Sequence, residues 1–205
     1  EMPEDLRKSI PYIRKIIEGF NIPIIELAGF EADDVIGTLA KEAEKQGFTT
    51  FMMTPDKDYA QLVSDNIFMY KPGKGGDDAE VWGLKEVQEN FGIKTADQVI
   101  DILGLMGDTA DNIPGCPGIG PKTAEKLIAD FGSIDGIYQN IDQLKGKQKD
   151  NLIEFEKQVR LSRHLATIIL DVPIEFNTKN LTRDPLNKDA LIALFEELEF
   201  RTLIQ

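Results

Sequence analysis

The spacing of apolar residues changes once along this chain of 205 residues, near residue 84. Before that point, short apolar runs typical of strands alternate with amphipathic stretches typical of helices. After it, nearly every stretch has the spacing of a helix. Alternating strands and helices favour a parallel or mostly parallel sheet with helices packed against it. We therefore expect an α/β fold with a parallel or mixed sheet and flanking helices, followed by a helical module.

The expected helices of the first part cover residues 3–20, 31–46 and 57–63, and the expected strands cover 22–27, 49–54, 67–70 and 79–82. The strand over 49–54 is expected to be buried, and the last two strands are expected to pair across a polar loop. In the second part we expect helices over 84–91, 95–106, 121–131, 133–140, 147–163 and 187–199, with an extended segment over 165–176.

The composition is that of a soluble globular protein, with 41% hydrophobic and 29% charged residues. No apolar stretch approaches the length needed to cross a bilayer. The first residues are charged, so we expect no secretory signal. A single cysteine, Cys116, cannot form an internal disulfide, which fits a reducing compartment. We therefore expect a cytoplasmic protein.

The net charge of −13 argues at first against a nucleic-acid partner, but the acidic residues are unevenly distributed. Residues 1–114 carry 11 basic and 22 acidic side chains, whereas residues 115–170 carry 8 basic and 7 acidic ones. Part of the acidity also lies in a candidate metal site, where bound cations would offset it. The segment after residue 114 is therefore the part of the chain that repels DNA least.

Three short clusters contain seven carboxylates that are candidate catalytic metal ligands: Glu31, Asp33, Asp34, Asp56, Asp58, Asp108 and Asp111. Carboxylate oxygens bind hard cations such as magnesium. Two such cations can clamp the attacking and leaving oxygens of a phosphodiester. A glycine-rich segment at residues 113–123, described below, is a candidate phosphate-binding loop. Together with that loop, the clusters predict a metal-dependent nuclease.

Each cluster also has an ordinary structural explanation. Carboxylates at residues 31–34 suit the first turn of a helix, and those at residues 56–58 suit a helix cap. Asp108 and Asp111 suit an Asx-type loop. These alternatives stay open for each cluster by itself. The conjunction of three clusters favours a metal site, because carboxylates that a fold brings together repel one another unless cations bind.

A segment rich in glycine and proline, residues 113–123, follows the third cluster. Pro121 suits the first position of a helix, and the N–H groups of Gly118 and Gly120 would face a phosphate oxygen. The candidate DNA-binding residues are Gly115, Gly118, Gly120, Lys122, Thr123 and Lys126. The alternative is an ordinary corner between two helices. A nucleotide P-loop does not fit, since Pro121 precedes the lysine and no apolar strand precedes the loop.

Three motifs, GFEADDVIGTLA, TPDKDYAQLV and MGDTADNIPGCPGIGPKTA, resemble the 5′-nuclease (5′-to-3′ exonuclease) domain of bacterial DNA polymerase I, a member of the flap-endonuclease family. The resemblance runs from MPEDL to LFEELEF. It implies a partial PIN-like nuclease core over residues 1–83 and a helical module with a helix-hairpin-helix over residues 84–170. It further implies a C-terminal extended segment and helix, residues 171–205, that pack back on the core.

The resemblance implies hydrolysis of DNA at 5′ flaps, nicks and RNA primers, with Mg²⁺ or Mn²⁺ activating a water. Residues 31–34 match the first metal of the family, and Asp56, Asp58, Asp108 and Asp111 match mainly the second. The hairpin matches the element that grips duplex phosphates and can hold K⁺. Such a protein would be bacterial, cytoplasmic and nucleoid-associated, and fused to proofreading and polymerase regions. His164 is not needed as a base, and we expect it at the surface or in packing.

In the family, a segment with a first core strand, two aspartates and a basic arch precedes the counterpart of MPEDL. Nothing in this sequence matches that segment, so we expect an incomplete two-metal site and poor cleavage by this chain. The alternative is a non-catalytic module that binds DNA structures through the hairpin. A nucleotide-binding protein is disfavoured because the P-loop is broken.

Overall fold

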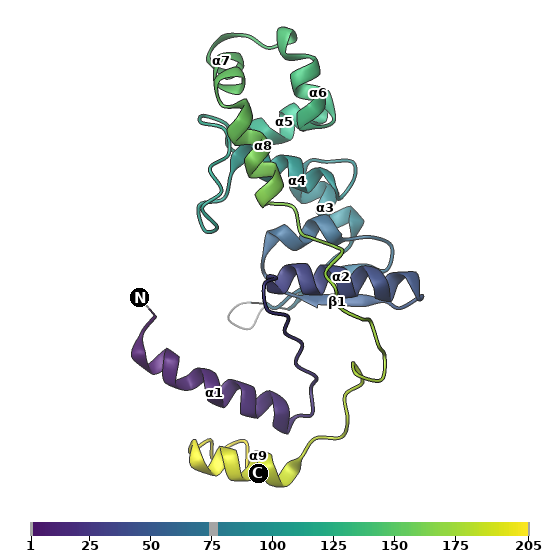
Figure 1. Ribbon diagram of the computed structural model, residues 1–205, viewed down its shortest axis with the longest axis vertical. Coiled ribbons are helices and arrows are strands. Elements are labelled where there is room, and N and C mark those ends of the chain that lie inside the picture. The colour runs from purple at the N-terminus through teal and green to yellow at the C-terminus, as the bar shows by residue number, and fades with distance from the viewer. Residues whose placement is uncertain (1, 74–77, 205) are drawn as a thin grey trace. The chain divides into compact units, whose positions relative to one another are not determined.

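The computed structural model describes residues 2–73 and 78–204. They form two compact units (Figure 1). The central unit is Gly29–Ile174, and the terminal unit combines the segment that ends at Ala28 with the segment that begins at Glu175. The boundaries expected at residues 83/84 and 170/171 stay predictions.

The central unit contains a mixed three-stranded sheet in the order β1-β2-β3. Strand β1 (Thr50–Met53) is parallel to β2 (Ile67–Lys71), and β3 (Glu80–Trp82) is antiparallel to β2. The expected pairing of the last two strands is thus confirmed, although residues 74–77 of their loop lie outside the described residues. Helix α2 (Ala32–Lys45) packs against the sheet (Figure 1).

Strand β1 is apolar on both faces but buried on one. Met52 faces the core, whereas Phe51 and Met53 are 57% and 72% exposed. Phe51 stacks on Phe68 of β2 at 5.4 Å between ring centroids. Within the described residues β1 pairs with a strand on one side only. The prediction of a buried strand here is therefore wrong for the outer face.

The described residues of the central unit also form eight further helical segments, namely η1 (Lys57–Leu62), α3 (Leu84–Phe91), α4 (Gln98–Met106), α5 (Pro121–Phe131), α6 (Ile134–Gln139), η2 (Ile141–Gln143), α7 (Gly146–Glu154) and α8 (Glu156–Leu165). Helix η1 is a 3₁₀-helix. The single helix expected over 147–163 is wrong, because the chain breaks at Phe155 into α7 and α8.

Helix α4 lies against α5 and α8, and its contact with α8 is very close. A Cβ atom added to Gly104 would stand 2.9 Å from the Cα of Arg163, so only glycine fits there without a shift. Beside this contact, Arg163 Nε donates to Asp101 Oδ1 at 2.7 Å. Burial raises the pKa of Asp101 and Arg163 opposes that shift. One hydrophobic core runs from Met69 in the sheet to Ile137 in the helices.

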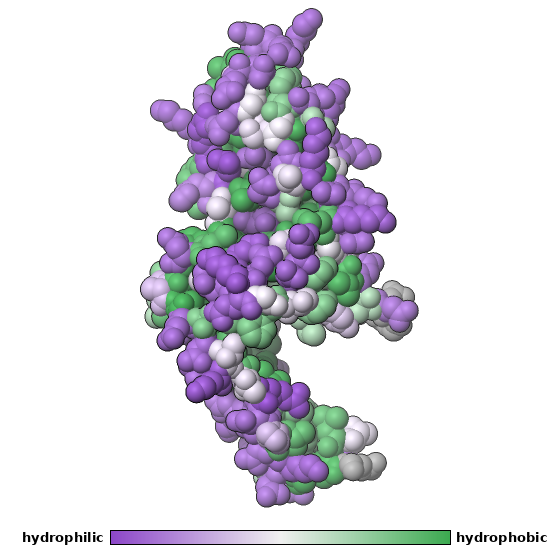
Figure 2. Space-filling model, turned by 90° about the vertical axis from the view of Figure 1, so that its right-hand side faces the viewer, coloured by the Kyte–Doolittle hydropathy of each residue, from purple (hydrophilic) through white to green (hydrophobic). Residues whose placement is uncertain are grey.

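The terminal unit is a pair of helices, α1 (Glu4–Gly19) and α9 (Lys188–Glu197). They approach closely at Gly19, where an added Cβ would stand 2.6 Å from Leu191 Cδ2. The strand expected over 22–27 is wrong, because this stretch pairs with no strand among residues 2–73 and 78–204. Apolar side chains remain at the surface of this unit (lower part of Figure 2).

None of the helices within residues 2–73 and 78–204 is both long enough and apolar enough to span a membrane.

Candidate metal centre

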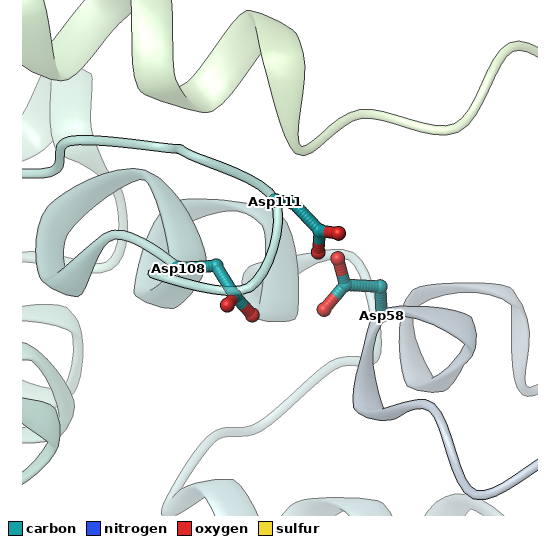
Figure 3. Close-up of side chains that lie close together, drawn as sticks. All are labelled: Asp58, Asp108 and Asp111. Atoms are coloured by element: carbon teal, nitrogen blue, oxygen red, sulfur yellow. The ribbon is translucent and has the colours of Figure 1, made fainter. Parts of the chain in front are cut away.

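Three aspartates from two distant segments meet in the central unit (Figure 3). Asp58 comes from η1, while Asp108 and Asp111 come from the loop after α4. One carboxylate oxygen of each lies within 4.8 Å of the others. We call these three residues the aspartate cluster. The expected meeting of the second and third carboxylate clusters therefore occurs in the structure.

Asp58 is positioned by the cap of its own helix. Asp56 Oδ1 accepts from the Asp58 N–H at 3.0 Å, and Thr54 Oγ1 accepts from the Asp56 N–H at 3.1 Å. These bonds start η1 just after the carboxyl end of β1, the edge where α/β sheets commonly place their sites. The capping role considered for Asp56 is confirmed, and the cap directs Asp58 into the cluster.

Asp108 and Asp111 are positioned by a short closed loop. Asp108 and Ile113 exchange both backbone hydrogen bonds, at 2.8 and 2.7 Å. Asp108 Oδ1 also accepts from the Ala110 N–H at 2.8 Å, which is the Asx-type turn considered from the sequence. Asp111 is exposed within this loop. The turn and the cluster are thus two roles of the same residues.

The carboxylates of the first cluster have two different surroundings: Asp34 is hydrogen-bonded inside the fold, whereas Glu31 and Asp33 line a cleft. Asp34 is buried, and its oxygens accept from the N–H groups of Ile169 at 2.8 Å and Glu31 at 3.3 Å. Burial raises the pKa of Asp33, and the negative charges of Asp34 and Asp56 raise it further. Five of the seven carboxylates line one open cleft of about 410 Å³, namely Glu31, Asp33, Asp56, Asp58 and Asp111.

The chemistry of the aspartate cluster suits a hard cation. Asp58 Oδ1 is buried and has no hydrogen-bond partner among the described residues, which is a costly state for a carboxylate. Burial and then the charge of Asp56 raise the pKa of Asp58 to about 6. Carboxylate oxygens at this spacing are ligands for magnesium or manganese. The residues present therefore fit a divalent metal.

Lys57 is a member of this site that the sequence analysis did not identify. Its ammonium pairs with Asp108 Oδ2 and lies 3.7 Å from Asp58 Oδ1. The hydrogen bond from Lys57 is the main cause of the lowered pKa of Asp108. In the sequence, only the position of Lys57 between two candidate ligands in TPDKD indicates that it could belong to the site. His164 is exposed and lines a neighbouring pocket with Glu31 and other acids.

The glycine and proline segment forms a tight hairpin between α4 and α5. A Cβ on Gly115 would stand 2.3 Å from the Gly107 nitrogen, and both glycines have positive φ. Gly120 caps α5 and Pro121 is its first residue, as expected. Within the described part of the chain, no group accepts from the N–H of Gly118 or Gly120.

The basic side chains beside the hairpin are accessible to solvent. Lys122 and Lys126 are exposed, and Thr123 is half-buried. Neither lysine forms an ion pair with another described residue. The N–H of Gly115 is occupied within the fold, because it donates to Ser162 Oγ at 3.0 Å. Among the described residues, the hairpin donors without an acceptor therefore include the N–H groups of Gly118 and Gly120 and the two lysine side chains.

Family models match nearly the whole chain. Residues 1–92 match a model described as the 5′-3′ exonuclease N-terminal resolvase-like domain. Residues 94–189 match one described as the 5′-3′ exonuclease C-terminal SAM fold. The α/β part followed by a helical part agrees with both descriptions.

The chain is similar in sequence to part of several bacterial DNA polymerases I. The chain is 43% identical over 204 residues to DNA polymerase I of Bacillus subtilis and 38% identical over 206 residues to that of Caldicellulosiruptor bescii. It spans 23% and 24% of their lengths, with 99% and 100% of its own residues matched.

Two solved structures share the fold. A T5 5′-exonuclease with bound zinc superposes with a TM-score of 0.68 at 22% identity, over 99% of this chain and 72% of that one. The catalytic core of Rad2 with DNA superposes with a TM-score of 0.63 at 18% identity, over 96% and 65%.

Proposed function

Since this chain belongs to the 5′-3′ exonuclease family, we propose that it is the metal-dependent, structure-specific 5′-nuclease part of a DNA polymerase I. It would hydrolyse phosphodiesters at the 5′ ends and flaps of duplex DNA, as in primer removal, nick translation and repair. The observation that carries the proposal is the aspartate cluster, where a buried carboxylate oxygen lacks a partner beside an acid-lined cleft.

The proposed roles follow from the geometry. Asp58, Asp108 and Asp111 would hold one divalent ion, Mg²⁺ or Mn²⁺, and Glu31 and Asp33 line the cleft where a second would lie. Bound divalent ions supply charge stabilisation and an acidified water in phosphodiester hydrolysis. The chain itself holds Asp58 and Asp108 in place before binding, by the cap at Asp56 and the turn at Asp108.

The hairpin is proposed as the DNA grip. The unpaired N–H groups of Gly118 and Gly120 and the exposed Lys122 and Lys126 suit phosphate oxygens of a duplex, without reading its sequence. A T5 flap endonuclease of the same fold, 25% identical, is described in a complex with DNA and metal ions. Potassium at the hairpin, RNA primers as substrates and a place with the nucleoid in the cytoplasm are proposed from the family resemblance.

Cleavage of a 5′-labelled flap duplex tests the proposal. With Mn²⁺, the chain is expected to release short labelled products at a low rate, and Asp111→Asn is expected to lower that rate by about a hundredfold or more because a metal ligand is lost. Asp111 is exposed, so the variant keeps its fold. Equal cleavage by the two proteins would rule out the role of Asp111.

The hairpin also favours a second candidate, a module that binds DNA structures without cleaving them. That function predicts duplex binding in EDTA that weakens with salt and weakens again in Lys122→Met, while Asp111→Asn binds normally. Binding of this kind without any Mn²⁺-dependent cleavage would support the module and contradict the nuclease.

A further inference from the structure

The ammonium of Lys57 lies where a metal ion would bind the aspartate cluster. It pairs with Asp108 Oδ2 and approaches Asp58 Oδ1 to 3.7 Å. These two carboxylates are 7% and 12% exposed, so solvent screens the pair weakly. Among the described residues, Lys57 is the only cation that forms an ion pair with the cluster.

The position of Lys57 is fixed by the same cap that fixes Asp58. Lys57 is the first residue of η1 and directly follows the capping Asp56. A cation tethered in this way competes with a free ion at a high effective concentration. Its side chain is 40% exposed, so it has open space toward which it can move away.

The third aspartate is not engaged by this lysine. Asp111 is exposed and forms no ion pair with any described residue. A divalent ion can therefore first meet Asp111 and then displace the ammonium from Asp108 and Asp58. A monovalent ion carries the same charge as the ammonium, so displacing the ammonium adds no electrostatic attraction to the carboxylates. A divalent ion carries twice that charge and is attracted more strongly.

We propose that Lys57 is a built-in counter-cation that occupies the aspartate cluster in the absence of metal and that a divalent ion must displace to bind there. Lys57 thereby stabilises the metal-free fold and weakens metal binding, since both cations compete for the same carboxylates. The inference rests on the metal centre of the proposed function but not on cleavage, and it concerns a residue that is not itself a ligand.

Calorimetric titration of the 205-residue chain with MnCl₂ tests this inference. Lys57→Met is expected to lower the Kd for Mn²⁺ by about tenfold or more, because a competing positive charge has been removed. Lys57→Arg keeps the charge and is expected to bind closer to the wild-type value. The matched control is Lys149→Met, which removes a lysine paired with Asp142 at 2.7 Å outside the cleft, and its Kd stays unchanged.

Thermal unfolding gives a second readout that needs no activity. In EDTA, Lys57→Met is expected to unfold about 3 °C or more below the wild type, because three neighbouring carboxylates lose their counter-cation. With excess Mn²⁺, the difference in unfolding temperature between the variant and the wild type is expected to become smaller or to change sign. If Lys57→Met does not fold, Lys57→Gln replaces it in both measurements.

The outcomes separate this inference from the nuclease proposal. An unchanged Kd in Lys57→Met, or no Mn²⁺ binding by either protein, overturns the inference. Tighter Mn²⁺ binding by Lys57→Met without flap cleavage by the wild type supports it and contradicts the proposed nuclease activity of this chain.

Discussion

Single residues of the metal centre serve the fold and the site with the same atoms. Asp56 lines the cleft and also accepts the N–H of Asp58 in the first turn of η1, while Asp108 joins the cluster and closes a turn. For these residues, charge and hydrogen-bond acceptance can be separated by substitution. Asparagine keeps an acceptor oxygen and removes the charge, whereas alanine removes both.

Asp56 offers the clearest test of this double role. In EDTA, Asp56→Ala is expected to be less stable than Asp56→Asn by about 1 kcal/mol, because alanine loses the cap of η1. Both variants relieve the repulsion of Asp58 equally, so the difference reports the cap. Urea unfolding measures it. Equal stability of the two variants would mean that the cap contributes nothing.

At the scale of elements, glycines decide which helices can approach. Gly104 lets α8 come within contact of α4, and this pair fixes the start of the hairpin at Gly107. Gly120, by contrast, has open space around the position of a Cβ and an extended backbone that any residue can adopt.

The two glycines predict opposite responses to alanine. Gly104→Ala is expected to lower the free energy of unfolding by about 1–3 kcal/mol, because the new methyl group meets the backbone of Arg163. Gly120→Ala is expected to leave the free energy of unfolding unchanged or to raise it by up to about 1 kcal/mol. Urea unfolding of both proteins checks this. Similar losses in the two variants would contradict the close contact between α4 and α8.

Most elements follow from local sequence, and the failures have physical causes. The apolar run at residues 22–27 has the composition of a strand, but strand formation needs a partner and Pro23 lacks a donor. The break at Phe155 between α7 and α8 carries no glycine or proline to announce it. The strand β1 is apolar on both faces, so its sequence could not show which face the core would cover.

The aspartates proposed as ligands could be named from the sequence, whereas the ion pair of Lys57 with them could not. Motifs place Asp58 and Asp108 in the site through the family resemblance, and the structure brings them together. Lys57 contacts Asp108 across 51 positions of sequence, and no periodicity or spacing relates the two. The pairing appears only when the fold brings the end of β1 to the loop after α4.

At the scale of the whole molecule, the described carboxylates and hairpin residues of the site all belong to the central unit. Its hydrophobic core is built entirely from residues within Gly29–Ile174. The terminal unit has its own contact between α1 and α9, at Gly19 and Leu191. Each unit therefore has packed side chains of its own.

This division predicts that a shortened chain of residues 29–174 folds alone. It is expected to unfold in one cooperative transition and to bind Mn²⁺ with a Kd within about threefold of the 205-residue chain, since its core and ligands are intact. Circular dichroism and calorimetry measure both. A shortened chain without cooperative unfolding would mean that the central unit depends on the terminal helices.

The outer face and free edge of β1 have a practical consequence for solubility. Phe51 and Met53 are exposed, and a strand with apolar side chains and unpaired backbone groups is a template for other chains. Association of copies of the chain is therefore expected at this edge of the described sheet. Yield of dispersed protein should therefore rise with slow, cool expression, and with a lysine in place of Met53 on the solvent face.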